Sequence, residues 1–256
     1  MKNIITLTLA FISFAAASQS RIKEFSMGYV FSLPRSPMNE TIRNASGLAI
    51  DCYFTPRGKR YMLGAEISVN GYGHDKTRQT YSFDDGSTAQ MDIAVNNNFY
   101  NLLLGGRYYL GHGRVQPFVT GKFGYSFYST DLNIYDPDDF DHCEPVDTEV
   151  LKKDGSLIFS AGAGLQWDLR PKTKPGVLFL TLAANYLSGG KVSYMNVDAP
   201  MQSQAAHQSD VYTKFLNTQT QVVHEHHVGN VYSSLIEMMD FRLGISLRMT
   251  YPANGE

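Results

Sequence analysis

The sequence has little net charge and, beyond its first residues, no long apolar run. With 22 Lys and Arg against 24 Asp and Glu, the formal net charge is −2, and both signs are spread along the chain. This balance gives no electrostatic reason to expect nucleic-acid binding. After the N-terminal segment, no stretch reaches the ~18 consecutive apolar residues of a transmembrane helix. We therefore expect neither a nucleic-acid partner nor a helical membrane anchor in the mature chain.

The N-terminus has the pattern of a signal peptide. Lys2 precedes an apolar run over residues 4–17 that is too short to span a bilayer and ends in small residues. We predict a cleaved leader at residues 1–18, followed by one large domain at residues 19–256. A buried N-terminal helix is the alternative interpretation of the same run.

The clearest positive feature is the alternation of apolar and polar residues, which is strongest over residues 239–251. In a β-strand, alternate side chains point to opposite faces. One face of this segment would carry Phe241, Leu243, Ile245, Leu247, Met249 and Tyr251, and the other Asp240, Arg242, Ser246, Arg248 and Thr250. An apolar face opposite a charged face is typical of a strand with lipid outside and a polar lumen inside.

The same period appears in eight segments bounded by turn residues. They cover residues 23–33, 46–55, 60–73, 95–110, 115–129, 156–169, 177–190 and 236–251. Short connections at 56–59, 111–114 and 170–176 alternate with long ones at 34–45, 74–94, 130–155 and 191–235. The pattern predicts an all-β fold, an eight-stranded antiparallel up-and-down transmembrane β-barrel with short periplasmic turns and long extracellular loops.

Face parity tests this prediction, because an error of one residue in the strands would scatter charges over both faces. The presumed lipid face carries no charge and includes Phe25, Met27, Tyr29, Leu48, Ile50, Leu63, Ile67, Leu102, Leu104, Phe123, Leu157, Phe159, Trp167 and Leu182. Glu24, Gln166 and Asn185 fall on the opposite face. So do the residues of a predicted lumen charge network, which are Asp51, Glu66, Arg107, Lys122, Asp168, Asp240, Arg242 and Arg248. An eight-stranded barrel is filled by side chains, so these charges need partners or water.

Two of the long connections show signs of further strand structure. Residues 79–83 and 88–93 flank the turn sequence 84–87, which predicts a hairpin that projects past the membrane. Residues 219–223 and 228–233 form a second candidate ribbon. The two cysteines fall near the end of the second strand, Cys52, and in the third long loop at the opposite barrel end, Cys143. A disulfide needs Cα atoms within about 7 Å, so we do not expect these residues to pair.

The chain resembles the small OmpA-like and OmpX-like outer-membrane β-barrels, especially single-domain barrel proteins of Bacteroidota. The resemblance rests on the leader, the eight alternating segments, the sequences at residues 105–110 and 116–119, and the closing strand. It implies an integral protein of the bacterial outer membrane, in contact with membrane lipid and inserted by the barrel-insertion machinery. The chain continues over residues 252–256 instead of ending on the aromatic residue of a strictly C-terminal insertion signal.

Three clusters of side chains have residue types suited to metal binding or catalysis. His224, Glu225, His226 and His227 offer ligands for Zn²⁺ or Cu²⁺, although their spacing is not that of the H-E-x-x-H motif. The acidic third loop, with Asp136, Asp138, Asp139, Asp141, Glu144, Asp147 and Glu149, lacks the spacing of an EF-hand. His207 and Ser209 lie in a polar loop, with no strand motif to support a catalytic role. The simpler interpretation in each case is a solvated loop.

The sequence therefore predicts no catalytic residues and no cofactor. The leading hypothesis is a non-enzymatic barrel with a side-chain-plugged lumen. It would act through its extracellular loops, either by binding a surface ligand or as a subunit of an envelope complex with another protein. The alternatives are a pore for small solutes or ions, and a lipid-modifying enzyme.

Overall fold

A computed structural model describes residues 22–55, 60–82, 88–111, 113–136, 145–169, 178–196, 209–217 and 222–250. The strands are β1 Ile22–Pro34, β2 Ala45–Thr55, β3 Tyr61–Ser82, β4 Thr88–Tyr109, β5 Val115–Tyr135, β6 Asp147–Asp168, β7 Leu178–Asn196, β8 Ser209–Asn217 and β9 Val222–Thr250. Met38–Glu40 forms a short 3₁₀ turn, η1. No helix in these ranges is long and apolar enough to cross a membrane. The predicted signal peptide at 1–18 lies outside them.

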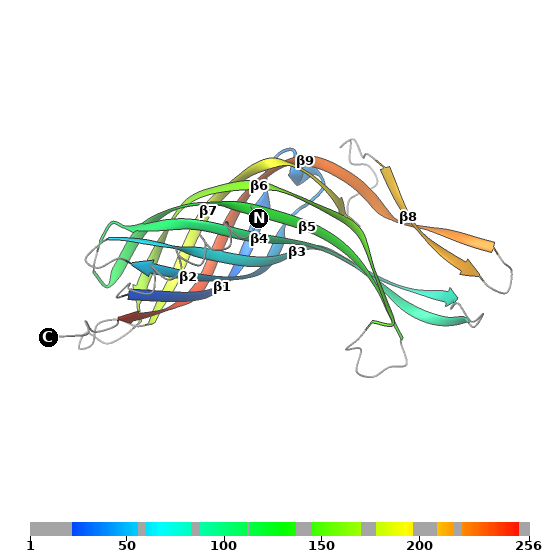
Figure 1. The fold of residues 1–256 in the computed structure, drawn as a ribbon, viewed down its shortest axis with the longest axis horizontal. Helices are drawn as coiled ribbons and strands as arrows, with labels where there is room; N and C mark the ends of the chain where they lie inside the picture. The colour runs from blue at the N-terminus through cyan, green and yellow to red at the C-terminus, as the bar shows by residue number, and fades with distance from the viewer. Residues whose placement is uncertain are drawn as a thin grey trace, which may run out of the picture.

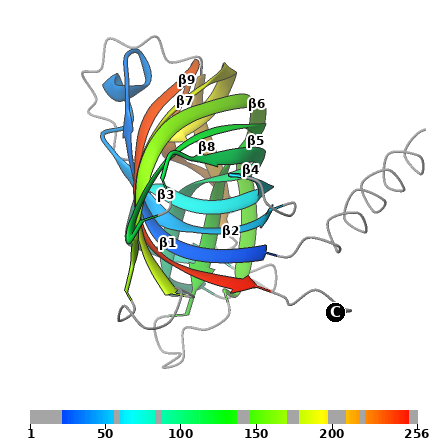
Figure 2. The same cartoon turned by 90° about the vertical axis from the view of Figure 1, so that its left-hand side faces the viewer.

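Eight of the strands close into an antiparallel barrel (Figures 1 and 2). Each of β1 to β6 pairs with the next strand, β7 pairs with β9, and β9 pairs with β1 to close the ring. The closing register places Phe25 opposite Leu247, and Leu178 lies opposite Leu247 on its other side. Closure satisfies the backbone groups that an open sheet edge would expose. The predicted eight-stranded barrel is confirmed.

The barrel wall has the two predicted faces. In β1, Phe25, Met27 and Tyr29 are 43–55% exposed, whereas Glu24 and Ser26 are buried. The same alternation runs through the other barrel strands, and no described member of the predicted lipid face is buried. The apolar side chains therefore form an outer band, and the polar ones turn inward, because parity is set by the pleat.

Three of the four predicted long loops are largely strand. β3 and β4 pair out to Ser82 and Thr88, which confirms the predicted hairpin, and β5 and β6 pair out to Ile134 and Asp147. The connection predicted at 130–155 was therefore wrong over most of its length. Pairing continues beyond the apolar outer band, where Ile93 and Val95 of β4 and Leu132 of β5 form a further buried apolar cluster. Figure 1 shows the paired strands diverging from the barrel at this end.

The second predicted ribbon was wrong in its pairing. β8 pairs with the first part of β9, from Ser209 opposite Val231 to Asn217 opposite Val222. Residues 222–223 and 228–233 of the predicted arms lie on β9, and residues 219–221 lie outside the described residues. β9 runs on without a turn here, and a bulge opposite Val211 and Tyr212 takes up one extra residue of β9, Val228.

The apolar core lies inside the barrel and changes character along it. We call the two barrel ends the short-turn end, where β2 is followed by β3, and the long-loop end, where β3 is followed by β4. Toward the long-loop end, a large cluster combines aromatic and aliphatic side chains with Met38 and Ile42 of the first loop. A small cluster of Tyr53, Met62, Tyr109 and Phe118 lies toward the short-turn end, among charged groups.

Candidate functional site in the barrel lumen

The structure brings most of the predicted lumen charges together. Seven of them lie inside the barrel, on five strands: Asp51, Glu66, Arg107, Lys122, Asp240, Arg242 and Arg248. The eighth, Asp168, is the last residue of β6, at the short-turn rim, where its backbone pairs with that of Arg114. Parity alone placed these side chains inward, and their partners depend on how the strands are staggered around the barrel.

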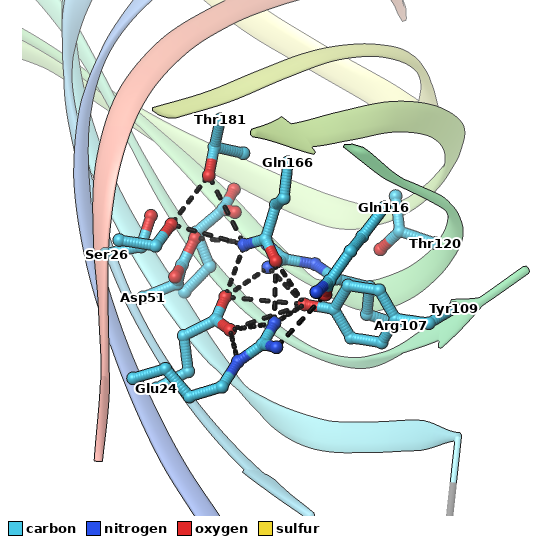
Figure 3. A network of polar contacts seen from close by, with 12 residues as sticks. Glu24, Ser26, Asp51, Arg107, Tyr109, Gln116, Thr120, Gln166 and Thr181 are labelled. Atoms are coloured by element: carbon cyan, nitrogen blue, oxygen red, sulfur yellow. Dashed lines mark hydrogen bonds and ion pairs between the residues drawn. The ribbon is translucent and has the colours of Figure 1, made fainter. Parts of the chain in front are cut away.

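The ion-pair network nearest the short-turn end is centred on the carboxylate of Glu24 on β1 (Figure 3). Arg107 Nη1 lies 2.6 Å from Glu24 Oε1, and Arg248 Nη2 lies 2.8 Å from Glu24 Oε2. Gln166 Nε2 also donates to Glu24 Oε1, at 2.6 Å. The Tyr109 hydroxyl donates to Gln166 Oε1 at 2.8 Å and accepts from both guanidinium groups. One carboxylate thus joins groups from β4, β6 and β9.

A second part of the network lies farther along the lumen. Arg242 Nη1 is 2.5 Å from Asp51 Oδ2 and 2.9 Å from Glu66 Oε2. Lys122 Nζ lies 2.7 Å from the same Glu66 oxygen. Arg107 Nη2, at 3.8 Å from Asp51 Oδ2, connects the two parts. In this second part, the two negative charges of Asp51 and Glu66 balance the two positive charges of Arg242 and Lys122.

Aromatic rings cover the two arginines near the short-turn end. The Arg107 guanidinium lies 4.5 Å from the ring centre of Tyr53 and 4.4 Å from that of Phe118. Arg248 lies 4.3 Å from the ring centre of Phe179. Such contacts stabilise a desolvated cation. The rings also pack the space around the charges, which an eight-stranded barrel has just enough room to hold.

Sequence reasoning missed the centre of this network. Glu24 and Gln166 were assigned to the inward face but were not included among the network residues, and Tyr109 was not considered. All three share the inward parity of their strands, so parity was the available signal. Parity does not give the position of a side chain along the barrel axis. Only the stagger of the strands shows that β1 and β4 bring Glu24 and Arg107 to the same level along this axis.

Toward the long-loop end, the lumen is filled by an aromatic layer, defined here as Tyr72, Phe99, Tyr128, Tyr194 and Tyr232. Phe99 stacks on Tyr128 with ring centres 5.3 Å apart, and Tyr128 lies 5.9 Å from both Tyr72 and Tyr194. These rings come from β3, β4, β5, β7 and β9. Together they form a layer of packed rings across the lumen beyond the ion-pair network.

The first loop packs onto this aromatic layer. Met38 and Ile42 are fully buried in the cluster that contains the layer. The Thr41 hydroxyl hydrogen-bonds the Tyr194 hydroxyl at 2.6 Å, and the Asn196 amide donates to the Thr41 carbonyl. The backbone N–H of Arg35 donates to the Glu237 carbonyl. The loop therefore covers the mouth of the barrel between β1 and β2.

The projecting strands carry a separate charged cluster. Asp92 on β4 accepts hydrogen bonds from Arg78, with Nε at 2.7 Å, and its other oxygen lies 2.9 Å from Lys76 Nζ. These two cations hold the pKa of the Asp92 carboxyl well below its usual range. The cluster ties neighbouring strands together beyond the apolar band.

The structure does not test the predicted metal sites, because most of their side chains lie outside its described part. His224, Glu225, His226 and His227 lie on β9 opposite residues 212–215 of β8, but their side chains lie outside the described part, as do residues 137–144 of the acidic loop. Elsewhere in the described chain, no group of three or more His, Cys, Asp and Glu could hold a metal ion. Cys52 lies half-buried in β2, and Cys143 lies outside the described residues.

Comparison with known proteins gives matches of structure only. No family model matches the chain. No curated protein sequence matches it either. Among solved structures, Neisserial surface protein A is 10% identical, with 88% of this chain and 95% of that chain covered and a TM-score of 0.44. A major outer membrane protein of Thermus thermophilus is 14% identical, with 89% and 99% covered and a TM-score of 0.40. Ail of Yersinia pestis is 13% identical, with 89% and 98% covered and a TM-score of 0.37.

These likenesses concern the fold and assign no role to this chain. The class of protein is nevertheless defined by its own architecture, a small closed β-barrel with an apolar outer band, the form that outer-membrane proteins take.

Proposed function

We propose that this protein is a non-enzymatic, integral outer-membrane barrel with a closed lumen that acts through the strands projecting at its long-loop end. The observation that carries the proposal is the filling of the lumen by two successive layers. The ion-pair network occupies the half toward the short-turn end, and the aromatic layer with Met38 and Ile42 occupies the other. Because the lumen is filled, we do not expect a ligand to bind or pass inside it. Binding at the projecting strands is therefore the activity that we favour.

The outer band supports membrane insertion. Apolar side chains such as Ile50, Ile67, Phe123, Leu157 and Phe159 are 57–65% exposed, and exposed apolar patches of this extent are unfavourable in water. Lipid as the surrounding solvent removes that cost. Fractionation of the expressing bacterium tests the location, and recovery of the full-length protein in a water-soluble fraction would contradict it.

A conductance measurement tests the closed lumen. Protein reconstituted into planar bilayers is expected to give no steady current, because buried ion pairs and packed aromatic rings occupy the two halves of the lumen. The Arg242→Ala/Arg107→Ala double variant, which removes the two cations that bridge the network, is the positive control for an opened lumen. Large, steady currents through the unmodified protein would instead support a passive pathway for small solutes or ions.

Shortening the projecting strands tests their role. One variant lacks residues 209–227, and the matched control lacks residues 77–93, so that each removes one projecting strand pair. Tagged proteins are isolated from gently solubilised outer membranes and analysed by mass spectrometry. A stoichiometric partner lost with only one of the two deletions would identify an envelope complex and its binding surface. A partner retained by both would contradict a role for these strands.

The absence of catalysis is part of the proposal and needs its own measurement. Mass spectra of lipid A from cells that overexpress the protein are expected to match those from cells with an empty vector. An added or missing acyl chain would show that the barrel is a lipid-modifying enzyme.

A further inference from the structure

A polar groove lies on the outer surface of the barrel, at the boundary between the apolar band and the projecting strands. Its volume is about 380 Å³, and it is formed where β2, β3 and β4 meet. Its polar side chains are those of Asn44 and Ser46 around the start of β2, His74 on β3, and Asn96 and Asn98 on β4. The groove therefore gathers uncharged polar groups from three neighbouring strands.

The groove exists because β2 begins at this level while β3 continues past it. The pairing of β2 with β3 ends at Ser46 opposite Gly71, whereas β3 stays paired with β4 beyond this point. A bulge between Gly71 and Gly73 lets Tyr72 turn into the lumen, where it is buried, and places His74 on the exposed outer face. The bulge and the end of β2 thus open a hollow on the outside of the wall.

The polar groove borders the apolar outer band directly. Leu48 on β2, Val69 on β3 and Tyr100 on β4 are 51%, 47% and 36% exposed. Each lies two residues from a residue that lines the groove, and residues two apart share one face of a strand. A lipid whose acyl chains lie on these three side chains would therefore place its headgroup at the groove.

The lining suits an uncharged ligand that is rich in hydroxyl groups. Among the described residues that line the groove, none is Asp, Glu, Lys or Arg. His74 Nδ1 donates to Asn96 Oδ1 at 2.7 Å, which leaves the Asn96 amide as a donor and Nε2 of the neutral imidazole as an acceptor. An anionic headgroup would need a cation, and the next outward residue of β3, Lys76, is paired with Asp92.

We propose that the polar groove binds the uncharged sugar headgroup of a membrane glycolipid, whose acyl chains lie on the apolar band beside it. Sugar hydroxyls both donate and accept hydrogen bonds, as the amide and hydroxyl groups of the lining do. This assignment rests on the membrane insertion proposed above, and it adds a class of ligand at the base of the projecting strands. It requires neither an open lumen nor a protein partner.

Native mass spectrometry of the whole protein, in a detergent without sugar such as tetraethylene glycol monooctyl ether, measures lipid binding. The probes are monoglucosyl and digalactosyl diacylglycerol, compared with diacylglycerol and phosphatidylcholine that carry the same acyl chains. At least one glycolipid is expected to bind about tenfold more tightly than the two lipids without sugar, because several hydrogen bonds are gained. Equal binding of all four lipids would overturn the proposal.

A free galactose disaccharide separates the two sources of sugar. It is expected to bind much more weakly than digalactosyl diacylglycerol, because it gains no contact with the apolar band. Equal affinity of the two would overturn the assignment to a membrane lipid. Binding is measured on purified protein, so its failure leaves the membrane location, which fractionation tests, unaffected.

Gly71→Val locates the site, because it fills the groove at a position where there is room for a side chain. A Cβ there would meet only Asn98 Oδ1, at 3.5 Å, and valine favours strands. Glycolipid binding should fall about tenfold or more. Gly121→Val is the matched control, since Gly121 is an exposed glycine of β5 whose Cβ would meet nothing within 4 Å and it lies outside the groove.

The control is expected to bind glycolipid as the unmodified protein does. Asn98→Ala, which removes one amide from the lining without adding bulk, is expected to weaken binding about three- to tenfold. Glycolipid binding that survives both Gly71→Val and Asn98→Ala unchanged would place the lipid elsewhere and refute the assignment.

Discussion

The two halves of the lumen are filled by opposite chemistry. Toward the short-turn end, Glu24, Arg107, Arg248 and their neighbours form a hydrogen-bonded ionic cluster, while toward the long-loop end, Phe99 and Tyr128 stack within an aromatic layer. Both halves are buried. The comparison shows that the interior of a narrow barrel can be packed either with paired charges or with aromatic rings.

The two kinds of lumen packing should respond differently to mutation. A buried ion pair that loses one partner leaves an uncompensated charge. This charge destabilises every strand that carries another member of the network. An apolar cluster loses contacts in proportion to the atoms removed, and here two of its members, Met38 and Ile42, belong to the first loop and not to the barrel wall. We therefore expect global effects from the ionic half and local effects from the aromatic half.

The largest effect is expected from Glu24→Ala. It leaves the buried Arg107 and the partly buried Arg248 without their shared carboxylate and should lower the free energy of unfolding by about 3–5 kcal/mol. Urea unfolding from detergent micelles measures this. Glu40→Ala, which removes an exposed acid in the first loop, is the control and should change stability by less than about 0.5 kcal/mol. Equal, small effects of the two changes would mean that the network contributes little.

The next largest effect, in the other half, is expected from Ile42→Ala. Removing a fully buried side chain typically costs about 2–5 kcal/mol, and here that cost should appear mainly as faster hydrogen exchange of residues 35–44. The exchange of β1 to β7 should change much less. If the whole barrel lost protection to the same extent as the loop, the distinction between global and local failure would not hold.

A smaller change is expected from Tyr194→Phe. The variant keeps the ring in the aromatic layer but loses the hydroxyl that bonds Thr41 and Ser234, which should weaken loop attachment by about 1 kcal/mol. Limited proteolysis in the first loop measures this against Tyr232→Phe, a change in the same layer. An unaltered cleavage rate would show that apolar contacts alone hold the loop.

The smallest effect is expected from the charged cluster of Lys76, Arg78 and Asp92, which lies outside both halves of the lumen. Its carboxyl pKa is lowered in the folded protein, so its stabilising contribution is complete above the unfolded value of about 3.9 and is lost as the pH falls toward the folded value. Hydrogen exchange of residues 76–92 should therefore rise in acid below about pH 4. Asp92→Asn should already show the higher exchange at neutral pH, and its response to acid should be weaker. A barrel-wide acid response without a local one would assign the effect to other carboxyls.

Alternation was sufficient to predict the barrel and its two faces. Phe25 and Glu24 take opposite sides because the pleat gives consecutive residues opposite directions, whatever surrounds them. Even spacing and short connections then favoured antiparallel neighbours and closure. The prediction failed beyond the apolar outer band, where β5, β6 and β9 continue. Residues 130–135 keep a short alternation, with Leu132 and Ile134 buried, but so short a run among polar residues was assigned to a loop.

The lumen shows the same division residue by residue. Parity placed six charged members of the network inside the barrel, namely Asp51, Glu66, Arg107, Lys122, Arg242 and Arg248. It also placed Glu24 inside, but it did not indicate that Glu24 is the centre of the network. Nothing in the sequence pattern indicated that Met38 and Ile42 would enter the barrel mouth. Contacts between β1, β4 and β9 join residues 83 and 224 positions apart. Such pairs depend on strand stagger and loop return, which no local pattern encodes.

The amino-acid sequence by itself determined which residues face inward, how many strands form the barrel and that its outer surface is apolar, because these follow from a period of two and from connection lengths. Only the tertiary structure decided that Glu24 is the centre of the ionic half and that the first loop completes the aromatic half. The physical reason is that closing the barrel brings distant strands to one level, and at that level each charge has only the partners that the stagger supplies.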